Sequence, residues 1–170
     1  LKTAIRSNDP VMFVESQLLY GIKGVVPGHD YTIPFGEAAV LREGKDATLV
    51  GWGPAVPEML QAAELMRQER GLEIEVIDIR TLVPIDYATI LHSVRKTGRC
   101  VVCSQSVNIC SYTADIAATI QAQAFDDLDA PVLRLGAKDG IAPQALGLEE
   151  VFLPHVGDML AILKEVCHGL

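Results

Sequence analysis

Two cysteines three positions apart, Cys100 and Cys103, have the spacing of a metal-binding or redox-active pair. They fall within an apolar run that predicts a β-strand, and successive side chains of a strand point to opposite faces. The two thiols should therefore lie on different faces, where they cannot share a metal ion. We predict that both are inert cysteines of the core. Reduced thiols favour a bacterial cytoplasmic or mitochondrial-matrix protein over a secreted one.

The turn formed by Gly51, Trp52 and Gly53 follows a predicted strand and precedes a predicted helix. This is the place of a dinucleotide-binding fingerprint, which needs a third glycine for close packing of the helix on the strand. Val56 stands at that third position, and Pro54 lacks an N–H group that a phosphate would use. The pattern therefore favours a tight strand-to-helix turn over a phosphate-binding loop.

Asp78 and Arg80 stand at the carboxyl end of another predicted strand, which is the edge where open α/β sheets bind ligands. We favour a structural ion pair or a loop anchor for them over a binding role. The loop at residues 136–140 has the glycines of a turn and could close over a ligand. A simple connection is the preferred interpretation of that loop.

The histidines do not stand beside a cysteine or a carboxylate pair at the spacing of metal ligands. They are His29, His92, His155 and His168. His29 lies in a segment rich in Gly and Pro, and we interpret it as a solvated loop residue rather than part of a site shared with another domain. No serine stands in a G-x-S-x-G nucleophile elbow; the candidates considered are Ser104, Ser106 and Ser111. The residues alone therefore predict no catalytic, cofactor-binding or metal-binding residue.

The composition is that of an α/β protein with a substantial core. The chain has 170 residues, of which 49% are hydrophobic and 21% charged, and its formal net charge is −8. This acidic balance argues against a nucleic-acid-binding protein, which would carry a basic face. No apolar run approaches the roughly 18–20 residues that span a bilayer, so we expect no membrane segment.

Residues 47–84 predict a strand, a helix and a second strand joined by a right-handed crossover. Helical spacing of apolar residues begins at Val56, Pro57 fits the first helical turn, and Gly71 can end the helix in a left-handed conformation. A second apolar strand follows at residues 73–79. Near-continuous apolar strands joined by a helix are typical of a parallel sheet.

The rest of the chain extends this pattern. The glycine-containing turn at residues 43–46 predicts a hairpin between strands at residues 37–42 and 47–50. Asp86 can cap a helix that Gly98 stops, and Pro154 precedes a last helix whose core stripe includes Met159 and Leu163. Further elements are expected as strands at 99–103 and 132–135, a helix at 113–124 and a loop at 136–144. The sum is a three-layer α/β/α fold with an open, mostly parallel five-stranded sheet.

The beginning of the chain differs from the rest. Residues 1–5 resemble the end of a helix, residues 11–14 form an apolar run that predicts a strand, and residues 20–34 are rich in Gly and Pro and lack periodicity. The strand needs cover, either from the chain's own sheet or at a dimer interface. We therefore expect the end of a preceding domain at residues 1–19, a linker at 20–34 and a complete domain at 35–170. The chain opens with Leu1 rather than Met, which favours a fragment or a processed product.

Several stretches together resemble one family, the beta subunit of thiamine-diphosphate-dependent 2-oxo acid dehydrogenases of the pyruvate and branched-chain types. The matching stretches are NDPVMFVESQLLYG, YTIPFGEAAVLREGKDATLVGWG, EVIDIRTLVPIDYATI, VRKTGR, ADIAATI, AFDDLDAPVLRL and EEVFLP. They run through almost the whole chain in the family's order, and as a set they are specific. The match covers only the family's C-terminal half, a transketolase C-terminal-type domain.

This resemblance implies a function in assembly. A parent enzyme of this kind is an oxidoreductase, a heterotetramer that decarboxylates a 2-oxo acid on thiamine diphosphate and transfers the acyl group to lipoamide within a multienzyme complex. The resemblance implies that thiamine diphosphate and Mg belong to the parent enzyme and that none is bound by this fragment, which should be inactive by itself. Residues 1–19 would be the remnant of the family's pyrimidine-binding domain.

The implied partners are an alpha subunit, a second beta subunit and the subunit-binding domain of a dihydrolipoyl acyltransferase, without nucleic acid or membrane. The family's docking positions for the acyltransferase correspond to Asp129 and Leu170. An acidic surface that meets a basic partner domain agrees with the net charge.

The chain departs from the family at two loops. Ser104-Gln105 and the segment 110–113 replace a His-Glu pair and a glycine-rich run, and the segment 139–143 replaces a proline-rich loop. Such loops vary with function, so an acetoin-type or other 2-oxo acid enzyme is as open as a pyruvate enzyme. Two further alternatives are another transketolase-superfamily enzyme, similar to deoxyxylulose-phosphate synthase, and a stand-alone ligand- or partner-binding α/β module.

Overall fold

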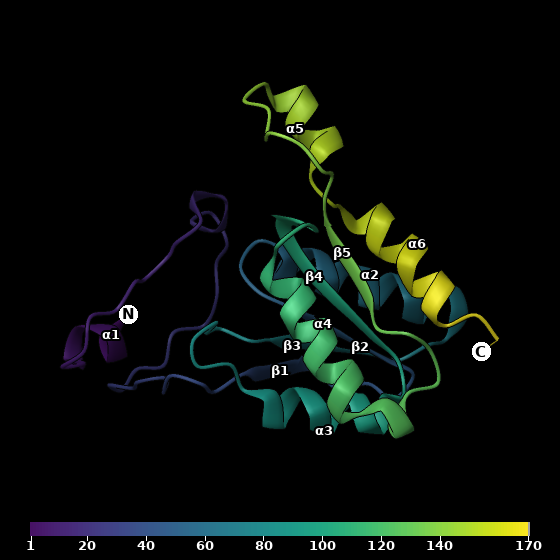
Figure 1. Cartoon of the computed structure of the whole chain (residues 1–170). Coiled ribbons are helices and arrows are strands. Elements are labelled where there is room, and N and C mark those ends of the chain that lie inside the picture. Colours follow the sequence, from purple (N-terminus) through teal and green to yellow (C-terminus); the bar gives the residue numbers. More distant parts are fainter. Residues whose placement is uncertain (170) are drawn as a thin grey trace.

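The computed structural model describes residues 1–169 and contains one five-stranded sheet with the strand order β1-β3-β2-β4-β5. The strands are β1 (Ala39–Arg42), β2 (Ala47–Gly51), β3 (Ile74–Asp78), β4 (Cys100–Val107) and β5 (Leu133–Ala137). Only β1 runs antiparallel, at the edge beside β3, and the other neighbours are parallel. The expected open, mostly parallel sheet is confirmed (Figure 1).

The central crossover forms as predicted. Helix α2 (Ala55–Arg70) connects β2 to β3, which pair in parallel with Ala47 opposite Ile74 and Gly51 opposite Asp78. Gly71 ends α2 with φ +71°, the left-handed conformation that glycine adopts without steric cost. The helix therefore stops where the sequence indicates, and β3 begins three residues later.

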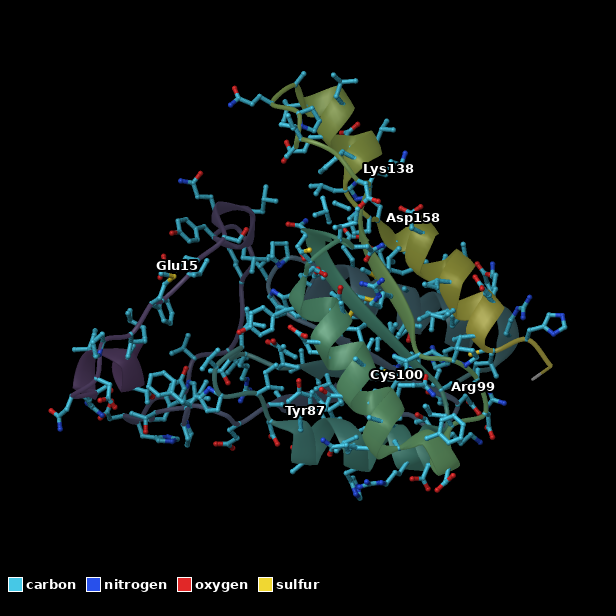
Figure 2. The ribbon with its side chains drawn as sticks, in the orientation of Figure 1. Glu15, Tyr87, Arg99, Cys100, Lys138 and Asp158 are labelled. Carbon is cyan, nitrogen blue, oxygen red and sulfur yellow. The ribbon has the colours of Figure 1, made fainter. Side chains whose placement is uncertain are left out.

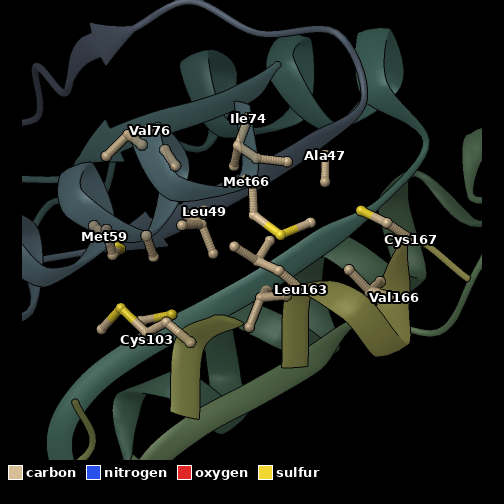
Figure 3. Packing of buried hydrophobic residues seen from close by; sticks show 14 of the residues in the cluster. Ala47, Leu49, Met59, Met66, Ile74, Val76, Cys103, Leu163, Val166 and Cys167 are labelled. Atoms are coloured by element: carbon tan, nitrogen blue, oxygen red, sulfur yellow. The ribbon is translucent and has the colours of Figure 1, made fainter. Parts of the chain in front are cut away.

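Helices cover both faces of the sheet, and each face has its own core. On one face, α2 and α6 (Val156–Val166) bury Met59, Met66, Met159 and Leu163 against the strands (Figure 3). On the other face, α3 (Tyr87–Thr97) and α4 (Tyr112–Gln123) bury side chains that include Ile90, Val94, Ile116 and Ile120. The three-layer arrangement is confirmed.

The predicted caps hold α3 in place. The Asp86 carboxylate accepts a hydrogen bond from the Thr89 N–H at 3.0 Å, and Gly98 ends the helix with φ +67°. A second oxygen of Asp86 accepts the Ala38 N–H at 3.0 Å, which joins the start of α3 to the residue before β1. One carboxylate thus caps the helix and fixes the edge strand.

The predicted hairpin between β1 and β2 is wrong. β3 lies between them, and β1 pairs with β3 in antiparallel register, with Ala39 opposite Asp78. Residues 43–46 connect the two strands, but the Lys45 and Asp46 N–H groups donate hydrogen bonds to the Glu73 carbonyl instead of closing a hairpin. The chain crosses under the start of β3, which Gly44 permits because a Cβ there would lie 2.2 Å from the Glu75 nitrogen.

The predicted strand at residues 11–14 is also wrong. The N-terminal arm, which we define as residues 1–38, contains α1 (Lys2–Arg6) and a single 3₁₀ turn, η1 (Gln17–Leu19), and no strand. Helix α1 agrees with the expected helix end. Met12 is 91% exposed and Val14 81% exposed, and no residue of the arm is buried. The apolar run finds no neighbouring strand, so it has no backbone partners with which to form one.

The segment after β5 holds an unpredicted helix. Gly136 and Ala137 continue β5, and after a loop the chain forms α5 (Leu146–Phe152), which extends away from the sheet (Figure 1). Further, η2 (Phe125–Asp127) follows α4.

Within residues 1–169, no helix is long and apolar enough to cross a membrane.

Candidate functional site

A hollow of about 320 Å³ opens at the carboxyl edge of the sheet, where β2 ends beside β4 and β4 continues to Val107. The crossover after β2 leads to α2 on one face, whereas β4 leads to α4 on the other. This divergence is the topological switch point at which open α/β sheets bind ligands. The lining includes Trp52, Leu82, Ser106, Ile109 and Tyr112, so the hollow is aromatic and apolar with hydroxyl groups at its margin.

Close packing under this edge explains the first glycine of the turn after β2. A Cβ on Gly51 would lie 2.8 Å from the Cys103 carbonyl oxygen and 2.9 Å from the Met59 side chain. Gly53 has φ +58°, and its carbonyl accepts the Val56 N–H at 3.1 Å. Because the Val56 N–H is used within the turn, the geometry agrees with a tight strand-to-helix turn and offers a phosphate one donor fewer.

The last part of β4 and the loop after it carry hydroxyl groups that hydrogen-bond to one another in two pairs. The Ser104 and Ser106 hydroxyls are 2.6 Å apart, and those of Ser111 and Thr113 are 2.5 Å apart. Among the described residues, no imidazole or carboxylate is hydrogen-bonded to any of these hydroxyls, so none has a base that would activate it as a nucleophile. The loop can therefore present hydroxyl groups to a ligand but shows no group poised for covalent chemistry.

Asp78 and Arg80 form a loop anchor. The Asp78 carboxylate accepts the Arg80 N–H at 3.0 Å, and Arg80 has φ +55°. Burial raises the pKa of Asp78, while the Arg80 N–H and guanidinium act in the opposite direction. Their side chains make no ion pair within the described part of the chain, so the loop-anchor alternative fits better than the ion-pair one.

The CxxC cysteines lie on opposite faces, as predicted. Cys103 packs in the core under α2 and α6, and Cys100 packs in the core under α3 and α4. Burial raises the pKa of both thiols, that of Cys103 to about 12, which keeps them protonated and unreactive at neutral pH. Cys110 is the exposed cysteine, with φ +51° in the loop after β4.

The histidines remain apart from one another. Across residues 1–169, no group of three or more His, Cys, Asp or Glu side chains is arranged to hold a metal ion. His155 has a structural role at the start of α6, where its backbone N–H bonds to Asp158 and its Nε2 lies 2.9 Å from the Glu150 carbonyl. His29 stands beside Tyr31 in the N-terminal arm, with ring centroids 6.4 Å apart.

Asp129 lies away from the hollow, at the amino edge of the sheet. Its N–H bonds to the Gly98 carbonyl at 2.8 Å, and its carboxylate lies 3.0 Å from the Arg99 guanidinium. Arg99 is also close enough to Cys167, at the end of α6, to lower that thiol's pKa, although burial outweighs it and raises the pKa overall. Arg99 therefore pairs with Asp129 and lies near the end of α6. Leu170 lies outside the described residues.

Local sequence patterns did not single out Arg99 as a residue near both Asp129 and the end of α6. The sequence shows that Arg99 directly follows Gly98, which ends a helix, and directly precedes β4. Its position near the end of α6 depends on the packing of β4 beside β5 and under α6. In the sequence, the segment that forms α5 is only a short run of Leu, Glu and Val residues, which does not predict a helix. Seven residues without a cap are too few for a periodicity argument.

Comparison with known proteins identifies relatives over nearly the whole chain. The family model "Transketolase, C-terminal domain" matches residues 36–159. The beta subunit of the pyruvate dehydrogenase E1 component of Rhizobium meliloti is 41% identical over 99% of this chain and 36% of its own length. The beta subunit of an acetoin:2,6-dichlorophenolindophenol oxidoreductase of Cupriavidus necator is 40% identical over 98% of this chain and 49% of its own length.

A solved structure has the same fold. The structure described as "Split gene transketolase, inactive beta4 tetramer" matches 86% of this chain with a TM-score of 0.70 and 26% identity, over 46% of its own length. The chain thus spans between about one third and one half of the length of these relatives.

Proposed function

The chain belongs to the transketolase C-terminal domain family, and from this premise we propose that it is the C-terminal assembly domain of the beta subunit of a thiamine-diphosphate-dependent 2-oxo acid dehydrogenase. The observation that carries the proposal is the 41% identity to a pyruvate dehydrogenase beta subunit over 99% of the chain. The parent enzyme would oxidatively decarboxylate a 2-oxo acid and transfer the acyl group to lipoamide. This domain would hold the subunits together.

The proposal divides the chain at three places. Residues 1–19 would belong to the preceding pyrimidine-binding domain, residues 20–34 would be the linker, and residues 35–170 would be the transketolase C-terminal-like domain. In support, every strand of the sheet lies at or after Ala39. The N-terminal arm is held to itself by exposed contacts, such as Lys2 and Arg6 with Asp30 and the Thr3 hydroxyl with the Ile33 carbonyl.

The cofactor would be bound elsewhere in the parent enzyme. Thiamine diphosphate needs a site for its diphosphate and Mg²⁺, and Mg²⁺ requires oxygen ligands such as carboxylates. The hollow at the carboxyl edge is lined by apolar and aromatic side chains together with Ser106, Cys110 and Ser111. It is lined by no carboxylate. Its residues do not fit this cofactor, so we assign it no step in the reaction.

The partners would be the alpha subunit, a second beta subunit and the subunit-binding domain of a dihydrolipoyl acyltransferase. We propose that the acyltransferase docks at the amino edge of the sheet, around Asp129 and its ion-pair partner Arg99. The family resemblance gives Leu170 as a second docking position, and this residue lies outside the described part of the chain. The net charge of −8 favours an encounter with a basic domain.

The substrate is proposed only as a class. Identity to the pyruvate and acetoin relatives is nearly the same, at 41% and 40%. A second candidate function, the C-terminal domain of another transketolase-superfamily enzyme, is favoured by the fold match to the split-gene transketolase. The sequence identity of 26% to that structure is lower, which places this alternative second.

The test is co-purification with an alpha subunit. We would express the chain with an affinity tag in its own host, capture it at physiological salt and identify the bound proteins by mass spectrometry. Recovery of a 2-oxo acid dehydrogenase alpha subunit or of the acyltransferase is the expected result. Recovery of a transketolase half instead would favour the second candidate, and a folded chain that captures neither would contradict the proposal.

A calorimetric titration tests the cofactor statement separately. Thiamine diphosphate added to the chain in the presence of Mg²⁺ should give no binding heat. Tight, Mg²⁺-dependent binding would contradict the assignment of the cofactor to the rest of the enzyme.

A further inference from the structure

A second hollow, of about 300 Å³, lies between the N-terminal arm and α5, and we call it the η1–α5 groove. Leu18 and Ile22 form one wall, Leu146 and Leu153 form the other, and Glu58 and Gln105 line it from α2 and β4. The groove joins segments that lie more than 120 positions apart in the sequence. It stands at the opposite edge of the sheet from Asp129.

Both walls of the groove are elements that bury none of their own residues. Helix α5 has seven residues and no buried side chain, and η1 has none either. Leu146 is 79% exposed and Leu18 is 69% exposed. An isolated helix of seven residues is unstable in water, because helices shorter than about 12–15 residues need tertiary packing. The walls therefore present apolar side chains to solvent in this chain.

The backbone fixes α5 at its base and leaves its side chains free. The Lys138 N–H donates to the Phe152 carbonyl at 3.0 Å, and the His155 ring Nε2 lies 2.9 Å from the Glu150 carbonyl. Lys138 and Asp158 both lie near the base of α5 (Figure 2). These contacts position the helix without using Leu146, Glu149 or the Glu150 carboxylate.

The charge of the groove is negative. Glu58, Glu149 and Glu150 line it, and no lysine or arginine does. Glu58 is already engaged, since it accepts the Val156 N–H at 2.9 Å and lies 3.9 Å from His155. The carboxylates of Glu149 and Glu150 make no ion pair among the described residues. Two uncompensated carboxylates beside exposed leucines complement a surface that is apolar and basic.

We propose that the η1–α5 groove binds an amphipathic helix of a partner protein, with apolar side chains between Leu18 and Leu146 and lysine or arginine side chains against Glu149 and Glu150. Laying the apolar face of a helix into such a groove would bury the surface that α5 leaves exposed. The proposal rests on the proposed function only in requiring that the chain has a protein partner. Its test uses a synthetic peptide, so its failure would leave the alpha-subunit experiment unaffected.

The experiment compares two labelled amphipathic peptides by fluorescence anisotropy with the full chain. One peptide carries leucines on one face and lysines on the other, and the second carries glutamates in place of the lysines. The lysine peptide should bind and the glutamate peptide should not. In a chain with Glu149→Lys and Glu150→Lys, affinity for the lysine peptide should fall about tenfold. Leu146→Asp should weaken it by a similar factor.

A matched control reverses two exposed acidic residues outside the groove, Asp126→Lys and Glu165→Lys. This control has the same net charge as the groove variant, so it separates the groove from a general attraction of the acidic chain for lysine. Unchanged affinity in the control supports the proposal. Equal binding of the two peptides, an absence of binding by both, or equal weakening in control and groove variants would overturn it. Unfolding midpoints should be unchanged in all variants, because α5 buries no side chain and the control residues Asp126 and Glu165 are exposed.

Discussion

The apolar runs at residues 11–14 and 100–103 are equally long, yet the structure exposes the first and buries the second. Cys100 to Cys103 lie in β4 with 0% exposure, paired on one side with β2 and on the other with β5. Val14 in the N-terminal arm is 81% exposed and has no strand beside it. The difference is one of neighbours rather than composition, because a strand needs partners for its backbone groups.

The same contrast holds for charges and glycines. Lys96 of α3 is paired with the fully buried Glu75 of β3, whereas Lys2 in the arm is paired with an exposed Asp30. Gly44 lies directly against the backbone of β3, whereas Gly24 has nothing within 4 Å of its would-be Cβ. Matched substitutions in the arm and in the sheet domain can therefore be compared by the change that each causes in the free energy of unfolding.

The largest difference is expected from placing a charge in each apolar run. Val102→Asp puts a carboxylate with no partner into the core, which should cost more than about 4 kcal/mol and leave the chain unfolded or nearly so. Val14→Asp should change the free energy of unfolding by less than about 0.5 kcal/mol. Urea unfolding followed by circular dichroism measures both. If Val14→Asp also unfolds the chain, Val14 is buried against another surface in solution, which would contradict its exposure in the structure.

Alanine in place of glycine should separate the regions next. Gly44→Ala would place a Cβ 2.2 Å from the Glu75 nitrogen and 2.4 Å from the Ile74 carbonyl carbon, so the backbone must move, at a cost of about 3 kcal/mol. Gly24→Ala has open space and should be neutral or stabilising by about 0.5 kcal/mol, because alanine restricts the unfolded chain. Thermal unfolding of the two variants checks this. Equal midpoints would contradict the close approach of the β1–β2 connection to β3.

The ion pairs should give a smaller difference. Lys96→Met removes the partner of the buried Glu75, one of whose oxygens already lacks a hydrogen bond, and should cost about 2 kcal/mol. Lys96 itself is partly exposed, which keeps this estimate below that for a fully buried pair. Lys2→Met should leave the unfolding midpoint unchanged. A double variant, Lys96→Met with Glu75→Gln, should recover part of the loss, and no recovery would assign the loss to the Lys96 stem instead.

The smallest effect is a pH dependence at the junction of the two regions. Burial raises the pKa of Asp86, but hydrogen bonds from Thr89 and from the Ala38 N–H outweigh it, so the pKa lies below its usual range. The cap therefore adds stability above the unfolded-state pKa of about 4, and this is lost as the pH falls through the lower folded-state value. Asp86→Asn should cost about 1 kcal/mol at pH 7.

The same variant has a second signature at acid pH. The difference in unfolding free energy between Asp86→Asn and the unaltered chain should shrink between pH 7 and pH 3, because Asp86 of the unfolded chain takes up a proton near pH 4 while Asp86 of the folded chain does so only at lower pH. Urea titrations at the two pH values measure it. A constant difference would mean that the carboxylate charge contributes nothing to this cap.

The helices of the domain could be predicted well because their signals are local. Asp86 and Gly98 bound α3, Gly71 ends α2, and the stripe of Met159 and Leu163 faces the core in α6. The opposite faces of Cys100 and Cys103 followed from the alternation of a strand. The candidate site was less predictable. The Gly51–Gly53 turn was identified, but the hollow it borders and the η1–α5 groove both combine distant segments.

The sequence by itself determined the family and, apart from α5, the helices and strands of the domain, because periodicity, capping residues and motif order are properties of neighbouring positions. Only the tertiary structure decided that β1 pairs with β3 rather than β2, and that the run at residues 11–14 stays unpaired. It also decided that Arg99 pairs with Asp129. Each of these depends on which backbone groups and charges lie within hydrogen-bonding distance in space, and local patterns do not specify a partner far away in the chain.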